Sequence, residues 1–255
     1  MSQPSPLLLR TPWKTIKSAR YEVAILPWGA TEAHNYHLPY GTDIIESDYI
    51  AAESARKAVA SGARVVVLPT VPFGVNTGQL DIPLTINMNP STQAAVLTDV
   101  VDSVSRSGIR KFVLLNSHGG NDFKQMIREL QPRFPTMLLC TINWWQIVDQ
   151  ADFFDARDDH AGEMETSAML AIAPESVLPL SVAGKGSAKQ FRIEALQKRW
   201  AWTPRQWTKV TSDTGVGDPS KATAEKGRKY LEAVTSEIAG FLKDLSGANP
   251  GDLYR

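Results

Sequence analysis

Short apolar runs alternate along the chain with longer stretches whose apolar residues recur at helical spacing. The apolar runs over residues 23–27, 64–68, 111–115 and 136–142 predict buried β-strands. The intervening and following stretches predict helices over residues 44–61, 91–107, 121–133, 160–172 and 219–245. Strands that alternate with helices predict an α/β, three-layer fold, with a mostly parallel central sheet flanked by helices.

Polar residues at the expected helix starts suggest where the helices begin. Thr42 or Asp43 is expected to cap the first helix, and Ser91 the second. Asp218 is the expected cap of the last helix, because Pro219 can occupy the first helical position without losing a hydrogen bond.

Composition and charge narrow the class of protein. The 255 residues are 43% hydrophobic and contain no repeat or linker, so a single domain over residues 1–255 is expected. The 27 basic and 27 acidic residues balance without a basic stripe, which argues against nucleic acid as a partner. No apolar run of about 18 residues and no signal-peptide pattern is present, so neither a membrane span nor secretion is expected. The single cysteine, Cys140, lies in an apolar run typical of a buried thiol, and we expect a cytoplasmic protein.

The four histidines fall in three short segments, residues 28–43, 116–122 and 158–166. Each segment also carries carboxylates or glycines, and two of the segments directly follow predicted strands. Histidine with carboxylate is a donor set typical of zinc, manganese and iron sites. The carboxyl ends of parallel strands meet at one edge of a sheet, so residues far apart in sequence can converge there on one pocket.

The first segment predicts the centre of a two-metal site. Glu32 and His34 are two residues apart, so they can project together from an extended chain. Asp43 can fold back through the intervening turn and bridge two cations about 3.5–4 Å apart. The other expected ligands are His118 from the second segment and either Glu165 or Glu163 from the third.

His160 has a different expected role. Two cations would lower the pKa of a shared water to roughly 7, which makes a bridging hydroxide available to attack a carbonyl. His160, oriented by Asp158 or Asp159, would then pass a proton to the leaving nitrogen, a step worth about 10²–10⁴-fold. Asp159 is expected to fix the tautomer of this imidazole, and Glu163 is a further candidate catalytic residue.

Each feature also has a purely structural interpretation. Glu163 and Glu165 would complement a helix dipole from its first turn. Gly119 and Gly120 could form only a strand-to-helix turn. The structural interpretations explain each segment singly, but they do not explain why the histidines avoid the rest of the chain. The stretch 215–218 lacks the third glycine of a nucleotide-binding pattern, so no nucleotide site is expected there.

The same motifs resemble those of the creatininase (creatinine amidohydrolase) family. Positions 29–43 read G-A-T-E-A-H-N-Y-H-L-P-Y-G-T-D, similar to the family pattern G-x-x-E-x-H-G-x-H-L-P-x-x-x-D. Positions 116–121 match the family's N-x-H-G-G-N, and positions 160–167 match its H-A-G-x-x-E-T-S. Positions 215–223 resemble its glycine-rich C-terminal segment, so the similarity spans most of the chain in order.

This resemblance implies a two-metal hydrolase of a non-peptide C–N bond in a small cyclic amide or formamide. By position, Glu32, His34, Asp43 and His118 would be metal ligands and His160 a catalytic histidine. Two divalent ions (Zn, Mn or Fe) per subunit, a small-molecule substrate and a homo-oligomer, commonly a hexamer, are implied as well.

The chain departs from creatininase proper near the second motif. Gly120 stands where creatininase has a glutamate ligand, as in the deformylase-like members, so Glu165 is the expected fifth ligand. Asn35 replaces a glycine of the first motif. Gln79 and Leu84 replace a histidine and a glycine found in many members, and these changes are expected to alter the pocket.

Substrate contacts are expected from the loops around the ions. Trp145 aligns with a family tryptophan that covers the substrate, although packing against its neighbour is an equal alternative. The expected substrate-binding residues are His37, Asn76, Gly119, Gly120 and Trp145. A metal-dependent isomerase or lyase on a sugar-like substrate, and a non-catalytic ligand-binding protein, are the alternative functions. Release of ammonia, an amine or formate would distinguish hydrolysis from the isomerase or lyase reaction, and a metal-restored hydrolysis assay across lactams and formamides would decide against the non-catalytic protein.

Overall fold

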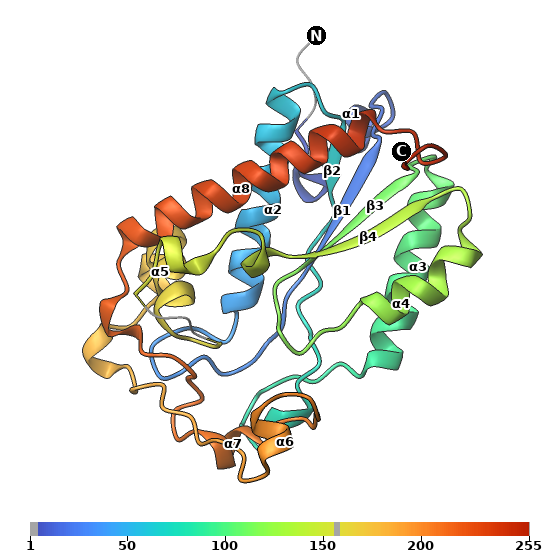
Figure 1. Ribbon diagram of the computed structural model, residues 1–255. Helices are drawn as coiled ribbons and strands as arrows, with labels where there is room; N and C mark the ends of the chain where they lie inside the picture. Colours follow the sequence, from blue (N-terminus) through green and yellow to red (C-terminus); the bar gives the residue numbers. More distant parts are fainter. Residues whose placement is uncertain (1–4, 156–158, 255) are drawn as a thin grey trace.

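The four apolar runs form one parallel sheet in the order β2-β1-β3-β4 (Figure 1). The computed structural model describes residues 5–155 and 159–254. Every neighbouring pair of strands runs in the same direction, which confirms the expected α/β fold. The strands are β1 (Val23–Trp28), β2 (Val65–Val67), β3 (Lys111–Asn116) and β4 (Leu138–Asn143).

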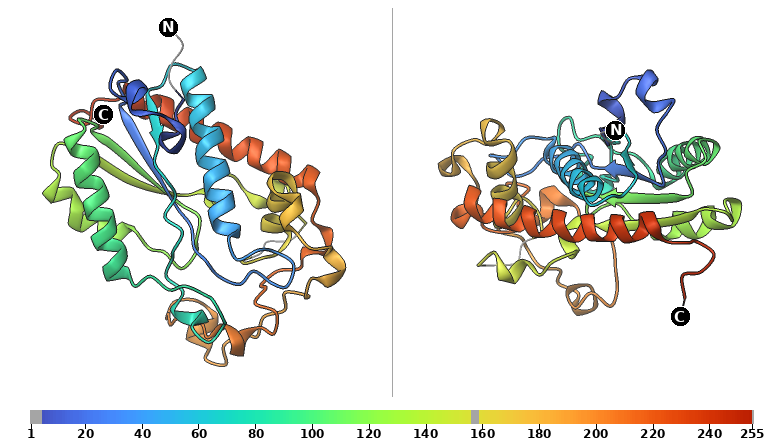
Figure 2. Two further views of the ribbon diagram at one scale, coloured as in Figure 1. Left: turned by 180° about the vertical axis from the view of Figure 1, so that it is seen from behind. Right: turned by 90° about the horizontal axis from the view of Figure 1, so that it is seen from above.

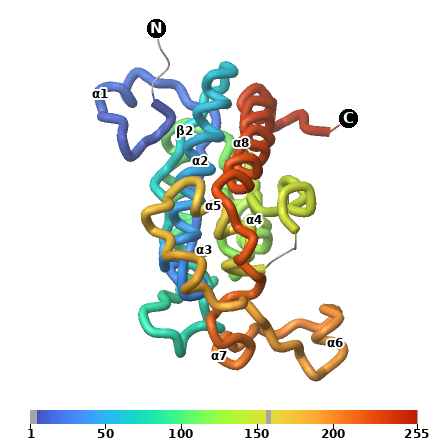
Figure 3. The backbone as a smooth tube through the Cα atoms, turned by 90° about the vertical axis from the view of Figure 1, so that its left-hand side faces the viewer, coloured from blue at the N-terminus to red at the C-terminus, as the bar shows by residue number. Residues whose placement is uncertain are grey.

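Helices cover both faces of this sheet, so the three-layer arrangement is also confirmed. Helices α2, α5 and α8 pack on one face, and α3 and α4 on the other (Figures 1 and 3). The long helices are α2 (Thr42–Ala60), α3 (Pro90–Arg106), α5 (Glu163–Ile172) and α8 (Ala224–Gly247), and the short ones are α1 (Trp13–Ile16), α4 (Lys124–Leu130), α6 (Glu194–Gln197) and α7 (Trp207–Val210).

The alternation of side chains along β1 explains why two cores form. Val23 and Ile25 point into the core shared with α2 and α8, whereas Leu26 and Trp28 point into the core shared with α3. Successive residues of a strand face opposite sides of the sheet. All of these side chains are at most 2% exposed, and burying each contributes about 1.5–3 kcal/mol. The uninterrupted apolar run is therefore the signature of a strand covered on both faces.

Several helices begin at other residues than expected. Helix α2 begins at Thr42 with Gly41 at the N-cap position, so neither Thr42 nor Asp43 is its cap. Helix α3 begins at Pro90, one residue before Ser91. The fixed φ of proline suits the first helical position, which explains the earlier start.

The closing helix is also interrupted near its start. Asp218 caps a short 3₁₀ helix (Pro219–Lys221) by accepting a hydrogen bond from the Ser220 N–H. Helix α8 begins after it, and the Thr223 hydroxyl accepts from the Lys226 N–H as the true cap. Among the described residues, no helix is both long and apolar enough to cross a bilayer.

The loops after β1 and β3 extend to the same end of the molecule. In Figure 1 they run to the lower part of the fold, where α6 and α7 also lie, whereas both chain termini lie at the top. The left-hand view in Figure 2 shows the same separation from behind, with both termini at the top and the α6–α7 region at the bottom. This end is the carboxyl edge of the sheet, where ligands bind in open parallel sheets.

Candidate metal centre

Four polar side chains, three from residues 28–43 and one from residues 116–122, meet beyond the carboxyl edge of the sheet. Glu32 and His34 lie in the loop after β1, Asp43 lies in the first turn of α2, and His118 follows β3. All four are at most 6% exposed. The convergence expected from the strand order is therefore present in the structure.

Two backbone positions let the first loop fold tightly. A Cβ on Gly29 would lie 2.9 Å from the backbone of Asp43, so only glycine fits where the loop passes the start of α2. Asn35 has a left-handed backbone with φ of 53°, which asparagine tolerates better than most residues. Its side-chain amide donates to the Gly184 carbonyl and accepts from the Gly184 N–H. The asparagine thus adopts a left-handed backbone at this turn and also anchors a neighbouring loop.

Asp43 faces a different histidine with each of its oxygens. Its Oδ1 lies 3.0 Å from His34 Nε2, and its Oδ2 lies 3.1 Å from His118 Nδ1. A carboxylate that presents its two oxygens to two separate nitrogen donors has the arrangement needed to bridge a pair of cations.

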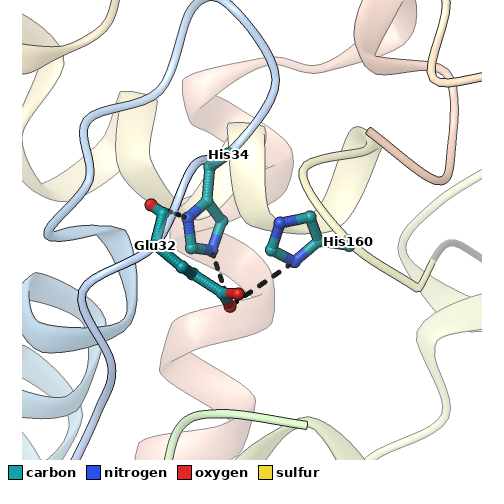
Figure 4. A group of neighbouring side chains, drawn as sticks. All are labelled: Glu32, His34 and His160. Atoms are coloured by element: carbon teal, nitrogen blue, oxygen red, sulfur yellow. Dashed lines mark hydrogen bonds and ion pairs between the residues drawn. The ribbon is translucent and has the colours of Figure 1, made fainter. Parts of the chain in front are cut away.

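Glu32 lies at the centre of the three imidazoles. Its Oε1 is 2.8 Å from His118 Nδ1, 4.0 Å from His34 Nε2 and 3.9 Å from His160 Nδ1. Figure 4 shows Glu32, His34 and His160 pointing toward one another, the first two from one loop and the third from the segment before α5. The other oxygen, Oε2, accepts a hydrogen bond from Gln79. Gln79 therefore orients a candidate ligand.

Three overlapping sets of donor atoms in the described residues are compact enough to hold a cation, with the atoms of each set within 4.8 Å of one another. The sets are Glu32–Asp43–His118, His34–Asp43–Glu165 and Glu32–His34–His160. Asp43 belongs to the first two sets, as a bridging ligand would. Imidazole and carboxylate suit zinc, manganese and iron, so the chemistry of this donor set fits a pair of such ions.

The charges inside the cluster also favour a cation. Burial opposes protonation of His34, but the carboxylates of Asp43, Glu165 and Glu32 together outweigh it and raise the pKa of His34 to about 10. Burial alone would raise the pKa of Asp43, yet the His34 and His118 imidazoles hold that pKa below its usual range. Buried carboxylates that draw protons onto histidines in this way would attract a divalent ion to the same place.

His160 presents an unprotonated nitrogen to the cluster. Its Nε2 lies 2.9 Å from the Ala33 carbonyl, which can only accept, so Nε2 carries the proton and Nδ1 does not. Burial, followed by the nearby His34, lowers the pKa of His160 to about 4. Backbone hydrogen bonds with Val216, from the glycine-rich segment, hold the residue in place. His160 thus has the geometry of a proton acceptor or of a third histidine ligand.

Two expected catalytic carboxylates have other partners. Asp159 Oδ2 lies 2.5 Å from Arg205 Nη1, and the Ala33 carbonyl, not Asp159, fixes the His160 tautomer. Glu163 is buried against α8, where it pairs with Lys226, so the geometry gives it no contact with the cluster. Glu163 and Glu165 differ in direction because residues two apart on a helix face different sides. Asp158 lies outside the described residues.

A cavity of about 190 Å³ lies over the cluster. Its lining includes Glu32, Asp43, His118, Gly119, Gly120, Trp144, Trp145, His160, Glu165, Arg205 and Trp207. Gly119, Gly120 and Trp145, three of the expected substrate-binding residues, line this cavity.

The other two expected substrate contacts lie outside this lining. The buried His37 is hydrogen-bonded to Thr166 Oγ1 at 2.9 Å, and the buried Asn76 donates to the Ile86 carbonyl at 3.1 Å. Both side chains support the surrounding loops, and their contact with a substrate stays a prediction.

Arg205 and Trp207 line the cavity but were not expected from the sequence. The Trp207 ring centroid lies 4.7 Å from that of His160, and Arg205 Cζ lies 4.7 Å from the same indole ring. Trp200, Trp202 and Trp207 fall within eight residues, an aromatic density that could have indicated a binding segment.

Residues 10–242 match the family model named Creatininase and described as creatinine amidohydrolase. A crystal structure of a Bacteroides fragilis protein, proposed to be a creatinine amidohydrolase, is 45% identical with a TM-score of 0.93, over 99% of this chain and 100% of that one. Solved creatininases described as Mn and Zn–Zn forms share the fold at 21% identity and a TM-score of 0.78.

Three relatives at 24–26% identity differ in the substrates that their names state. Creatinine amidohydrolase of Pseudomonas putida is 25% identical over 87% of this chain and 89% of its own length. The mycofactocin precursor peptide peptidase of Mycolicibacterium smegmatis is 26% identical over 87% and 84%. The 3-dehydro-scyllo-inosose hydrolase of Thermotoga maritima is 24% identical over 88% and 78%. Hydrolysis is common to all three names, whereas the substrate is not.

Proposed function

The chain belongs to the creatininase family, and from this premise we propose that it is a metal-dependent hydrolase of a small cyclic amide or formamide. The finding that carries the proposal is the cluster of three histidines and three carboxylates beneath a cavity of about 190 Å³. This volume is below the roughly 300–1,000 Å³ of sites for drug-sized ligands, which favours a compact reacting group.

Two divalent ions bound by these residues would supply Lewis-acid chemistry, activating water near neutral pH and polarising the scissile carbonyl. We propose Glu32, His34, Asp43, His118 and Glu165 as their ligands, with Asp43 shared. Its oxygens already face both His34 and His118.

His160 is the residue best placed to move a proton. We propose that its unprotonated Nδ1 takes a proton from the attacking water and later gives it to the departing nitrogen. The Ala33 carbonyl holds the ring by accepting the Nε2–H, which keeps Nδ1 directed toward Glu32. General catalysis of this kind is worth about 10²–10⁴-fold. The neutral state of this buried imidazole at pH 7 suits the first of the two transfers.

A ring ketone is the second candidate substrate class, favoured by the relative named as an inosose hydrolase. It resembles the amide candidate in offering a carbonyl to the same cluster. An isomerase or lyase reaction gains no support from the relatives, whose names are those of hydrolases.

The proposal is tested by loading the purified protein with Zn, Mn or Fe and measuring product release from lactams, formamides and polyhydroxylated ring ketones. Ammonia, an amine, formate or a ring-opened acid is expected only from the metal-loaded protein. His160→Ala should retain both ions and lose about 10²–10⁴-fold in turnover. Loss of an ion from His160→Ala would instead make this residue a ligand. Metal loading without turnover of any compound would argue against the proposed function.

A further inference from the structure

A second, larger cavity adjoins the one above the cluster. Its volume is about 660 Å³, and its wall is built mainly from the segment 188–203, which the candidate chemistry does not use. Arg205 and Asp159 are the residues that line both cavities. The ion pair between them, at 2.5 Å, therefore stands at the boundary between the cluster and the outer space.

The wall of the outer cavity is positively charged although the chain as a whole is neutral. Its ionisable lining residues are three cations, Lys189, Arg199 and Arg205, and one carboxylate, Asp159, which leaves an excess of two positive charges. Lys189 and Arg199 are exposed, and neither forms a salt bridge with a described residue. Their charges are therefore available to a ligand.

Arg205 is held in a position to bind a carboxylate. Its guanidinium lies 4.7 Å from the ring centroid of Trp207, an indole that also contacts His160. One N–H donates to Asp159, and the guanidinium carries five donors in total. Stacking on an aromatic ring and planar pairing with carboxylate are the two contacts for which arginine is best suited. The carboxylate of Asp159 already occupies one edge of this group.

We propose that the natural substrate carries a carboxylate remote from its scissile group, and that Arg205, Arg199 and Lys189 bind it in the outer cavity. The scissile group then occupies the inner cavity above the cluster. This inference rests on the proposed hydrolase function, because it assigns the second half of the substrate of that same site.

A matched pair of formamides tests the proposal: 6-formamidohexanoate carries a carboxylate at the far end of its alkyl chain from the formamide, and N-hexylformamide has the same chain without one. Calorimetric titration of the metal-loaded protein is expected to show at least about 10-fold tighter binding of 6-formamidohexanoate, because a bidentate arginine–carboxylate contact supplies the difference. This preference should shrink as ionic strength rises, since two of the three cations are exposed. Equal affinities, or no binding of either compound, would overturn the proposal.

Single substitutions distinguish the loss of a positive charge in the outer cavity from a loss of folding. Arg205→Gln should abolish the preference and Arg205→Lys should keep part of it. Arg199→Gln and Lys189→Gln should each reduce it a few-fold without risk to the core. Lys198→Gln is the control, because Lys198 adjoins Arg199 in sequence, pairs with Glu194 and does not line the cavity. A preference untouched by the Arg205, Arg199 and Lys189 variants would refute the assignment.

Turnover measured on the same samples distinguishes this inference from the proposed function. Hydrolysis of neutral lactams or formamides with no gain from an added carboxylate would overturn the inference and leave the function intact. Carboxylate-dependent binding without turnover of any amide or ring ketone would support the outer site and argue against the hydrolase.

Discussion

Replacing Asp43 by asparagine should weaken the binding of both metal ions at once. The substitution keeps the shape of the side chain but turns one oxygen into an NH₂ group, which cannot bind a cation. Either the oxygen 3.0 Å from His34 Nε2 or the oxygen 3.1 Å from His118 Nδ1 is lost as a donor. The three carboxylates of the cluster become two, so the formal negative charge that balances the ions falls by a third.

The expected loss of affinity follows from these contacts. Removing a residue that only orients a metal ligand costs about 10–100-fold in affinity. Removing a carboxylate oxygen that binds an ion directly should weaken the affinity for that ion by at least about 100-fold, or about 2.8 kcal/mol. The neutral oxygen that remains should weaken the other ion as well.

Metal content after desalting, together with titration against a competing chelator, measures this effect. The wild-type protein is expected to keep two ions and Asp43→Asn one or none. Asp48→Asn provides the matched control, because Asp48 lies on the same helix but is exposed and bonded to Thr70. Two ions of undiminished affinity in Asp43→Asn would refute the bridging role.

Three further predictions concern stability, reactivity and assembly. Lys226→Met should lower the free energy of unfolding by about 1–2 kcal/mol, because the buried Glu163 loses its ammonium partner. The loss is smaller than for a fully buried pair, since Lys226 is itself partly exposed. Thermal unfolding should show a drop of a few degrees for Lys226→Met and none for Lys229→Met, whose pair with Glu225 is exposed. Burial raises the pKa of Cys140 to about 12, so iodoacetamide should label it slowly at pH 8 until denaturant is added, and rapid labelling of the folded protein would contradict this. We also propose a homohexamer, for which light scattering should give six times the chain mass of 28.0 kDa, whereas a mass near that of one chain would exclude it.

The sequence alone predicted the layers of the fold because burial leaves a strong local signal. Strands covered on both faces are apolar along most of their length, and β1 and β3 are buried from end to end. The approximate positions of α2 and α3 followed from helical spacing in the same way. Their first residues did not, because Gly41 and Pro90 start these helices through backbone conformation rather than through a side-chain cap.

The convergence of Glu32, His34, Asp43 and His118 could also be predicted, since parallel strands direct the residues that follow them to one edge. The directions of individual side chains could not. Asp159 and Glu163 lie close to His160 in sequence, which made them candidate catalytic carboxylates. Their partners, Arg205 and Lys226, lie 46 and 63 residues away along the chain. Sequence spacing carries no information about such contacts.

The local sequence thus determined two features of this protein: an apolar parallel sheet, and a set of histidines and carboxylates at its carboxyl edge. Tertiary structure alone decided which carboxylate faces which imidazole, which nitrogen of His160 is free of a proton, and that the segment 188–207 encloses the approach to the cluster. The physical reason is the distance along the chain between the residues that interact. Periodicity and strand order act through neighbouring residues, whereas ligand geometry and cavity walls depend on packing between segments that meet only after the chain has folded.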